Sequence, residues 1–414
     1  MAESVETVIV GGGQGGLAIS YYLKKKGREH IVLEKAAQAG NAWRNDRWDS
    51  FTLVTPNWSF RLPGAEYGGE QPDGFMPRAE VVRAFEEYVE SFQLPLQYGV
   101  RANSIGPTNG KYRVETNADT YQAANVVVAT GLYQEPRVPA FAAGLPPDII
   151  LLHSGKYANP DALPSGAVLV AGSAQSGCQI AEELYQAGRK VYLCVGRTGR
   201  APRRYRGRDI FEWANLTGFL DRTAAQLPSP QARFGGTPQL SGKDGGKTLN
   251  LHKFARDGVV LLGRLQDASD GRVSLAPDLV EKLEFGDQFE RDFTRMVDGY
   301  IDANGLDAPE EVLPVLKDGY RSPVITELNL GREGIRTVIW ATGYRFDFSL
   351  VKFPVMDEYG FPVTENGATA YPGLYFAGLP WLPGQKSGLL LGVGEHAAHI
   401  AGRIAGNQKA ARAP

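Results

Sequence analysis

Residues 6–34 constrain the fold of this chain most, because they place a glycine-rich turn between a strand-like segment and a helix. The largely β-branched run at 6–10 leads into Gly11-Gly12-Gly13-Gln14-Gly15-Gly16, and no helix breaker follows until Gly27. A second apolar run then ends in Glu34. Strand, glycine turn, helix, strand and acid in this order form the complete dinucleotide-binding fingerprint.

Each glycine of the fingerprint has a distinct task. Gly11 makes the tight turn, Gly13 lets the backbone approach a pyrophosphate, and Gly16 lets helix and strand pack closely. The helix N-terminus offers amides to the phosphate charge, and Glu34 is placed to accept hydrogen bonds from both ribose hydroxyls. A glycine turn that serves packing alone is the alternative, but the full fingerprint favours dinucleotide binding.

The composition is that of a soluble globular protein, with 43% hydrophobic residues and a net charge of −2. This balance gives no electrostatic reason to expect nucleic acid or an anionic membrane as a partner. No apolar stretch approaches the roughly 18 residues that cross a bilayer, and the N-terminus lacks a signal-peptide pattern. Cys178 and Cys194 suggest no disulfide framework, and no cluster of ligands is spaced as a metal site. We therefore predict a cytoplasmic protein without membrane insertion or a bound metal.

The opening pattern returns beyond Pro164. An apolar run at 167–170 precedes Gly172-Ser173-Ala174-Gln175-Ser176-Gly177, and a helix at 180–187 and a strand at 191–195 follow. Ala174 replaces the middle glycine, and its methyl group crowds the approach of a pyrophosphate. A duplicated unit that has lost its ligand is the alternative, but two such units in one chain favour a second dinucleotide site.

The second unit differs from the first at the end of its second strand. No acid closes this strand; instead the chain carries Arg197, Arg200, Arg203 and Arg204. Guanidinium groups suit a 2′-phosphate, which a carboxylate would repel. The pattern therefore favours NADPH over NADH, with a solvated basic loop as the alternative.

Periodicity and turn residues predict several further elements. We expect helices at 79–92, 277–302 and 389–404, a hairpin over 112–124, strands at 125–129 and 337–340, and a strand and turn at 373–378. The stretch 43–75 is rich in aromatic residues and prolines. Its aromatic side chains are either core or the wall of a pocket for a flat aromatic ligand.

These motifs together resemble the two-dinucleotide-domain flavoproteins, and among them the chain is similar to the single-component, class B flavin-containing monooxygenases. Beyond the two glycine turns, the resemblance rests on 40–44, 55–57, 129–131, 153–157, 341–344 and 373–378. Residues 211–316 resemble a bacterial subgroup often labelled potassium-transport flavoproteins. The resemblance implies an α/β fold with two Rossmann-like domains. The FAD domain would span 1–157 and 341–414, and the NADPH domain 158–340 with a helical insertion at about 211–316.

The resemblance also implies roles for individual residues. FAD contacts fall on Gly11, Gly13, Gly16, Glu34, Lys35, Trp43, Thr55, Val100, Ala129 and Gly378. NADPH contacts fall on Gly172, Ser176, Gly177, Arg197 and Arg200. Asn57 matches the active-site asparagine near the flavin, where a buried amide can donate to a peroxide; next to Pro56 it is alternatively a turn residue.

The linker between the units matches the family signature F-x-G-x-x-x-H-x-x-x-Y/W only in its second half. His153 and Tyr157 fit, whereas Phe141 and Gly144 are misplaced. Tyrosine rather than tryptophan at the last position favours members that oxidise heteroatoms over Baeyer–Villiger members. We interpret His153 as a linker hinge rather than a catalytic base.

The implied activity is an NADPH- and O2-dependent monooxygenase that forms a flavin C4a-hydroperoxide and oxygenates a small lipophilic substrate at sulfur, nitrogen or an activated carbon. The protein would supply a dry pocket that prevents loss of peroxide. Alternatives are an FAD-dependent NADPH oxidoreductase or oxidase without oxygen transfer, and a non-catalytic flavin-binding sensor. A flavin disulfide reductase would need neighbouring thiols, which Cys178 and Cys194 do not provide. A homodimer is possible.

Overall fold

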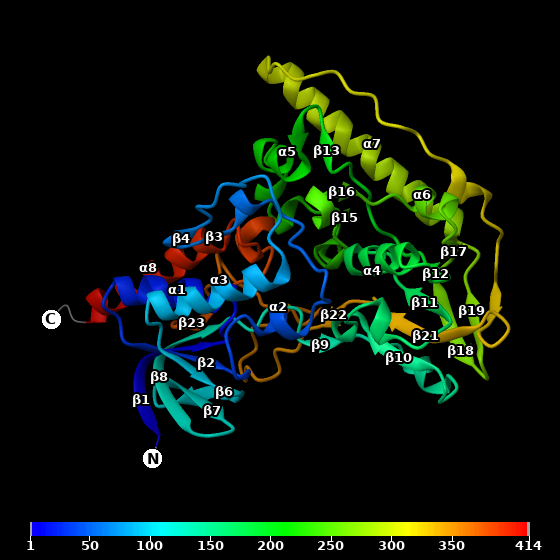
Figure 1. Cartoon of the computed structure of the whole chain (residues 1–414). Helices are drawn as coiled ribbons and strands as arrows, with labels where there is room; N and C mark the ends of the chain where they lie inside the picture. The colour runs from blue at the N-terminus through cyan, green and yellow to red at the C-terminus, as the bar shows by residue number, and fades with distance from the viewer. Residues whose placement is uncertain (1, 412–414) are drawn as a thin grey trace.

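The computed structural model describes residues 2–411 and contains two α/β units, each built on a largely parallel sheet (Figure 1). The first unit holds the N-terminal strand and the C-terminal helix, and the second holds most of the middle of the chain. The helices are α1 (Gln14–Lys25), α2 (Asn41–Asn45), α3 (Arg78–Ser91), α4 (Gln175–Gln186), α5 (Ile210–Leu216), α6 (Leu251–Arg256), α7 (Leu279–Asn304) and α8 (Val393–Ala411).

The first sheet has the strand order β5-β2-β1-β8-β7-β6, and β23 pairs with β8. Its strands are β1 (Glu3–Val10), β2 (His30–Glu34), β5 (Leu96–Tyr98), β6 (Ala102–Thr108), β7 (Lys111–Thr116), β8 (Thr120–Val128) and β23 (Leu374–Phe376). Strands β5, β2, β1, β8 and β23 are parallel. Helices α1 and α8 pack against each other. The C-terminal part of the chain therefore completes the unit that the N-terminus begins.

The second sheet is parallel throughout, with the order β10-β21-β11-β12-β17. Its strands are β10 (Ile150–His153), β11 (Ala167–Ala171), β12 (Val191–Cys194), β17 (Val260–Leu262) and β21 (Ile335–Trp340). Strand β11 is buried at every position, as expected for a parallel strand covered on both faces.

Smaller sheets of two or three strands lie outside the two main sheets. They are β3 (Arg61–Leu62) with β4 (Ala65–Glu66), β9 (Glu135–Pro136) with β22 (Tyr344–Arg345), β13 (Arg204–Tyr205) with β14 (Arg208–Asp209), β15 (Leu240–Ser241) with β16 (Lys247–Thr248), and the three-stranded β18 (Leu265–Ser269), β19 (Arg272–Leu275) and β20 (Glu327–Asn329). The β9–β22 ribbon pairs the two segments that connect the units, so both crossovers run side by side.

The sheets differ from the sequence-based predictions in three places. Strand β10 belongs to the second sheet, so the predicted domain boundary at residue 157 lies too far along the chain. Strand β8 is continuous where two separate elements were expected, because its first half pairs with β7 and its whole length with β1. The region 211–316 is not a purely helical insertion, since β17 within it extends the second sheet.

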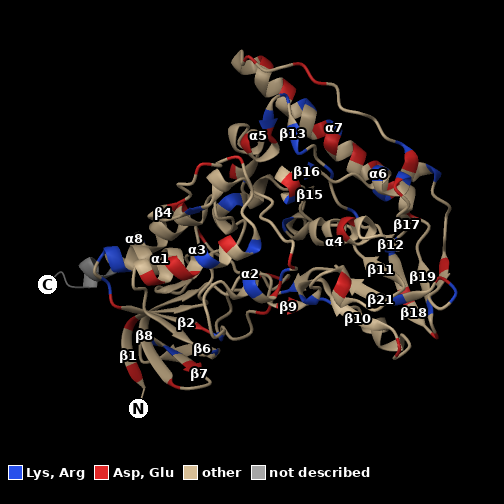
Figure 2. Ribbon diagram, in the orientation of Figure 1, with Lys and Arg blue, Asp and Glu red and all other residues tan. Residues whose placement is uncertain are grey.

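Helix α7 is the long helix predicted at 277–302, and it crosses the outside of the second unit (Figure 1). Acidic and basic residues alternate with uncharged ones along it (Figure 2). Its inner side contributes Phe293, Val297 and Ile301 to a core shared with Trp213 of α5 and Trp58 of the first unit. The insertion therefore packs against the segment that carries Asn57.

Candidate functional site

The first glycine turn, between β1 and α1, has two glycines that the fold itself requires. Gly11 has a positive φ of 111°, and a Cβ atom there would lie 2.5 Å from the carbonyl oxygen of Ala129. A Cβ at Gly16 would lie 1.9 Å from the carbonyl oxygen of Gly11. These contacts draw β1, α1 and the end of β8 together, as the fingerprint predicts.

Gly13 is different, because a Cβ atom there would have no heavy atom within 4 Å. It is the N-cap residue of α1 in an extended conformation that any residue can adopt. The fold therefore leaves free space at the helix N-terminus, where backbone amides and the helix dipole favour an anion. The open position fits the pyrophosphate of a dinucleotide.

Glu34 lies at the end of β2, beside this turn. Its two carboxylate oxygens accept hydrogen bonds from the backbone amides of Gly12 and Ala36, each at 2.8 Å. Val100 donates its amide to the carbonyl oxygen of Glu34 at 3.0 Å, so these two predicted FAD contacts lie side by side. Lys35 is exposed next to it.

The segment before α8 closes the first turn from the other side. A Cβ atom at Gly15 would lie 2.7 Å from the Cα atom of Gly378. The side-chain amide of Gln14 donates to the carbonyl oxygen of Gly388. The structure thus brings Gly378 against the fingerprint, although more than three hundred residues separate them in the sequence.

The second turn, between β11 and α4, repeats the geometry of the first. Gly172 has a φ of 112°, and a Cβ there would lie 2.5 Å from the carbonyl oxygen of Ala341. A Cβ at Gly177 would lie 1.9 Å from the carbonyl oxygen of Gly172. Ala174 is the N-cap residue of α4, in the place that Gly13 has in α1, and Ser176 lies in the first turn of the helix. The two units therefore share one construction, with a methyl group added at the second helix terminus.

The arginines that follow β12 have different environments. Arg197 is exposed, and its guanidinium lies 4.5 Å from the ring centre of Phe285. Arg200 is only 6% exposed and pairs with Asp287 at 2.6 Å and Glu290 at 2.9 Å. This pairing contradicts the prediction that Arg200 contacts a coenzyme phosphate, because its donors already bind carboxylates of α7.

Arg203 is also buried, and its ion pair with Asp209 uses Nε and Nη2 and leaves Nη1 for the first unit. Its Nη1 donates to the carbonyl oxygen of Val54 at 2.6 Å, and its guanidinium lies 4.2 Å from the ring centre of Phe75. The sequence placed Arg203 in a basic run and did not indicate this contact. Arg203 therefore holds the segment that leads to Asn57.

Asn57 begins a 3-10 turn (Asn57–Ser59) and is 5% exposed. Its backbone amide donates to the carbonyl oxygen of Gly74 at 2.9 Å, and its side-chain Nδ2 donates to that of Gln71 at 2.9 Å. Its Oδ1 has no hydrogen-bond partner among the described residues. An unpaired buried oxygen costs about 1–3 kcal/mol, so the turn alone does not account for this side chain.

The aromatic stretch divides into core and partly accessible residues. Trp48, Phe51 and Phe60 are buried in the core of the first unit. Trp43 of α2 is half-buried, and its ring centre lies 5.9 Å from that of Phe51. The guanidinium carbon of Arg47 lies over the Trp43 ring, 5.2 Å from its centre. Thr55, two residues before Asn57, is half-buried as well. Trp43 and Thr55 are therefore both partly exposed, and their contacts with FAD stay predictions.

His153 is the last residue of β10, the edge strand of the second sheet. Its Nδ1 accepts a hydrogen bond from the Gly155 amide at 3.2 Å, so Nε2 carries the proton and donates to the carbonyl oxygen of Gly343 at 2.9 Å. Burial lowers the pKa of His153 below its usual range. The imidazole is therefore a neutral bridge between β10 and the segment that follows β21, and the hinge role stays a prediction.

The two cysteines are buried in different elements, Cys178 in α4 and Cys194 in β12. Burial raises the pKa of both thiols, that of Cys194 to about 12. Neither thiol is a reactive thiolate at neutral pH. Within residues 2–411, no group of three or more His, Cys, Asp or Glu side chains is arranged to hold a metal ion. No helix in this range combines the length and apolarity needed to cross a membrane.

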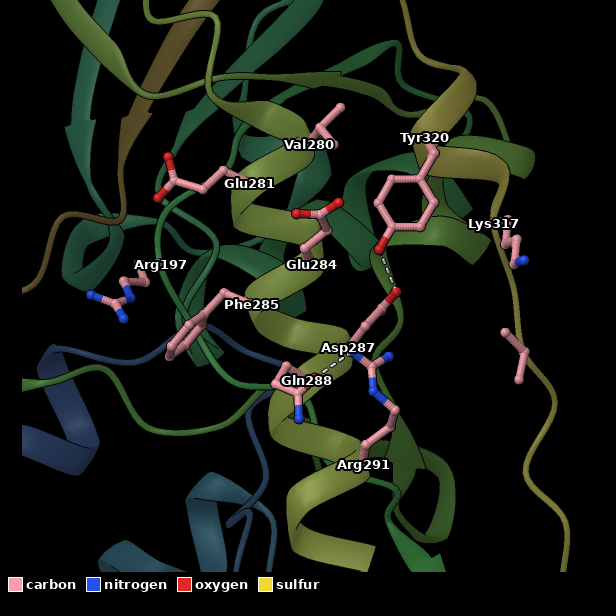
Figure 3. A pocket seen from close by; sticks show the side chains of 11 residues that line it. Arg197, Val280, Glu281, Glu284, Phe285, Asp287, Gln288, Arg291, Lys317 and Tyr320 are labelled. Atoms are coloured by element: carbon pink, nitrogen blue, oxygen red, sulfur yellow. Dashed lines mark hydrogen bonds between the residues drawn. The ribbon is translucent and has the colours of Figure 1, made fainter.

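A cavity of about 840 Å³ lies along the outer face of α7 rather than at the glycine turns (Figure 3). It is lined by Arg197, Phe285, Asp287, Lys317, Tyr320 and further residues of α7. Sequence reasoning connected only Arg197 with a ligand and assigned the apolar positions of α7 to packing.

Comparisons with known proteins agree with this architecture. Residues 8–208 match the pyridine nucleotide-disulphide oxidoreductase family. An uncharacterized CzcO-like oxidoreductase of Geobacillus kaustophilus is 31% identical over 97% of this chain and 98% of its own length. The indole-3-pyruvate monooxygenase YUCCA1 of Oryza sativa subsp. japonica is 26% identical over 82% of this chain and 83% of its own. The structure of a flavin-containing monooxygenase from Stenotrophomonas maltophilia superposes with a TM-score of 0.66 at 20% identity, covering 98% of this chain and 99% of that one.

Proposed function

Because the chain belongs to the CzcO-like oxidoreductases, a subgroup of the flavin-containing monooxygenases, we propose that it oxygenates a small lipophilic substrate at sulfur, nitrogen or an activated carbon. The enzyme is an oxidoreductase, and FAD and NADPH, the cofactors of this family, are its cofactors. Bound FAD supplies the oxygen chemistry, which we assign to the C4a-hydroperoxide route. The protein must then orient both cofactors and exclude water.

The observation that carries this proposal is the side-chain amide of Asn57. It is buried, its Oδ1 is unpaired, and Gln71 takes only one of its two N–H donors. Such an amide offers one donor and one acceptor to a group bound beside it. We assign it to the reactive edge of the flavin, where a fixed donor in a dry site favours oxygen transfer over release of peroxide.

The two glycine turns supply the dinucleotide sites of this proposal. The first unit would hold FAD at 11–16, with Glu34 at the ribose and Val100, Ala129 and Gly378 around the turn. The second unit would hold NADPH at Gly172 and Gly177, with Arg197 free for the 2′-phosphate. Since β10 joins the second sheet, the boundary between the FAD and NADPH domains falls before Ile150.

The partners of the enzyme follow from the same proposal. The enzyme would act on O2 and a small molecule, and it would neither bind nucleic acid nor insert into a membrane. We also propose a cytoplasmic location and include a homodimer. YUCCA1 is named for indole-3-pyruvate, an aromatic 2-oxo acid. We therefore include 2-oxo acids with thioethers, amines and ketones as candidate substrates.

The experiment measures oxygen uptake, hydrogen peroxide release and product with NADPH and each candidate substrate. The Asn57→Ala variant should keep its FAD and be reduced by NADPH at a near-normal rate. It should divert oxygen to hydrogen peroxide and lose roughly tenfold or more in product formation, because one preorganised donor is gone. The matched control is Asn45→Ala, which changes an exposed asparagine of α2.

The outcomes separate the alternatives. Full coupling in Asn57→Ala would leave Asn57 as a turn residue and remove the assigned role. Oxygen uptake that yields only hydrogen peroxide with every substrate would indicate an oxidase. A flavin that NADPH does not reduce would indicate a sensor without turnover. A disulfide reductase remains disfavoured, since Cys178 and Cys194 are buried apart and Cys178 donates its thiol to the carbonyl oxygen of Ser173.

A further inference from the structure

Helix α7 contacts the loop that follows β12 through Phe285, which lies beside Arg197 (Figure 3). The same loop carries Arg200, which pairs with Asp287 of α7. Building on the proposed NADPH site, we infer that α7 sets recognition of the 2′-phosphate. Phe285 positions Arg197 for the phosphate, and Asp287 with Glu290 anchors the loop through Arg200. A helix outside the parallel sheet would thus determine coenzyme choice.

The first contact is the stack of Arg197 on Phe285. The guanidinium carbon lies 4.5 Å from the ring centre, and Arg197 has no carboxylate partner among the described residues. A guanidinium held over a ring keeps its N–H groups free along its edge. Phe285 therefore restricts the position of Arg197 without using the donors that a phosphate needs.

The second contact is the close approach of α7 to the loop backbone. A Cβ atom at Gly199 would lie 2.7 Å from the ring of Phe289, and one at Gly286 would already touch the carbonyl oxygen of Thr198 at 3.5 Å. Glycine in a helix interior is unfavourable relative to alanine. Gly286 sits within α7 nonetheless, but a Cβ atom 3.5 Å from the Thr198 oxygen would make only an ordinary van der Waals contact, so the close approach rests on Gly199 and Phe289.

The third contact is the buried ion pair of Arg200. Its Nη1 donates to Asp287 at 2.6 Å, while Nε and Nη2 donate to the two oxygens of Glu290, each at 2.9 Å. A bidentate pair fixes direction as well as distance. Arg200 is therefore a positioning residue for the loop, three positions after the arginine that would contact the coenzyme.

The carboxylate of Asp287 has two further polar partners besides Arg200. The Tyr320 hydroxyl donates to it at 2.6 Å, and His252 Nε2 lies 3.3 Å from both of its oxygens. His252 Nδ1 accepts from the Gly319 amide at 3.0 Å, so Nε2 carries the proton. Although burial alone would raise the pKa of Asp287, the hydrogen bonds from His252 and Tyr320 and the charge of Arg200 lower it, and the carboxylate stays charged.

The test measures the binding of NADP+ and NAD+ to the FAD-loaded enzyme by calorimetry. We expect Arg197→Ala to weaken NADP+ binding selectively, by roughly tenfold. Phe285→Leu should weaken it roughly two- to fivefold, as expected for loss of a cation–π contact, and leave NAD+ unchanged. Phe285→Tyr keeps the ring and should retain the preference. Asn304→Ala, at the exposed C-terminal end of the same helix and outside the lining of the cavity, is the control.

The double variant Arg197→Ala/Phe285→Leu decides whether Phe285 acts through Arg197. We expect it to bind NADP+ no more weakly than Arg197→Ala alone. The role of α7 would be overturned if the losses of NADP+ affinity in the two single variants added up in the double variant. It would also be overturned if Phe285→Leu lost affinity for NADP+ and NAD+ equally. In both cases Arg197 would remain the residue that contacts the 2′-phosphate. An unchanged NADP+ preference in Arg197→Ala would instead show that Arg197 does not contact the 2′-phosphate. That result would contradict both the proposed role of Arg197 and the role of α7.

Discussion

Gly13 and Gly16 belong to the same turn, yet a side chain would meet different surroundings at each position. A Cβ at Gly16 would collide with the carbonyl oxygen of Gly11 at 1.9 Å, whereas a Cβ at Gly13 would meet open space. Gly13 also has a φ of −81°, which any residue adopts. The fold therefore requires a glycine at position 16 but not at position 13, where the proposed FAD pyrophosphate would require one.

This difference predicts two distinct losses. Gly13→Val should fold with a melting temperature close to that of the unmodified apoprotein, but purify colourless, because the side chain occupies the place of the pyrophosphate. Gly16→Val should fail to fold. Flavin absorbance and thermal unfolding of the two variants check this. A yellow, FAD-loaded Gly13→Val would show that the pyrophosphate lies elsewhere.

The arginine cluster shows what a sequence reveals about single residues and what it does not. The run of arginines after the second strand was visible, and Arg197 is exposed beside Phe285, so its contact with a phosphate stays a prediction. Nothing local distinguishes Arg200, because its partners Asp287 and Glu290 follow 87 and 90 residues later. Ion pairs between distant segments leave no periodic signal in the sequence. The prediction therefore assigned a coenzyme contact to Arg200, which instead joins the loop to α7.

At the scale of elements, the buried histidine of α8 predicts a pH dependence of stability. His396 donates from Nε2 to the carbonyl oxygen of Asn366 at 3.1 Å, and burial lowers its pKa to about 4. As the pH falls below about 6.5, the unfolded chain takes up a proton that the folded chain refuses. The free energy of unfolding should therefore decrease between pH 6.5 and 4, by on the order of 2 kcal/mol at pH 5.

Urea unfolding of His396→Gln at pH 7.5 and pH 5 tests this assignment. Glutamine can still donate to the carbonyl oxygen of Asn366 but does not titrate, so this variant should lose less stability on acidification than the unmodified protein. The exposed His399 of the same helix provides the control variant, His399→Gln. Equal acid sensitivity of all three proteins would contradict a buried neutral His396.

Most elements were predictable because their signals are local. Both strand–turn–helix units, helix α3 and helix α7 follow directly from apolar periodicity and from glycine positions. Strands β10 and β17 were not assigned to a sheet, because a strand of three or four residues shows too little periodicity to reveal its neighbours. Their place depends on pairing with β21 and β12, which only the assembled sheet defines.

At the scale of the whole molecule, the two units are joined by more than their connecting segments. Glu183 of α4 accepts hydrogen bonds from Ser50 of the first unit at 2.5 Å and from Tyr157, which follows β10, at 2.8 Å. His153 bridges to the second crossover through Gly343. Glu183 therefore fixes the helix of the second glycine turn relative to the unit that would hold the flavin.

This contact predicts a defect in hydride transfer rather than in coenzyme binding. Glu183→Ala removes the partner of Ser50 and Tyr157, so both cofactor sites persist but their relative orientation loosens. A small misplacement of reacting groups costs rate steeply, and we expect flavin reduction by NADPH to slow by roughly tenfold. The dissociation constant for NADPH should stay within about twofold, because no residue of the second turn has changed. Anaerobic stopped-flow reduction separates the two quantities, and Glu87→Ala, at an exposed position of α3, provides the control. A Glu183→Ala enzyme that is reduced at the normal rate, or that loses NADPH affinity instead, would show that this junction does not set the distance between the cofactors.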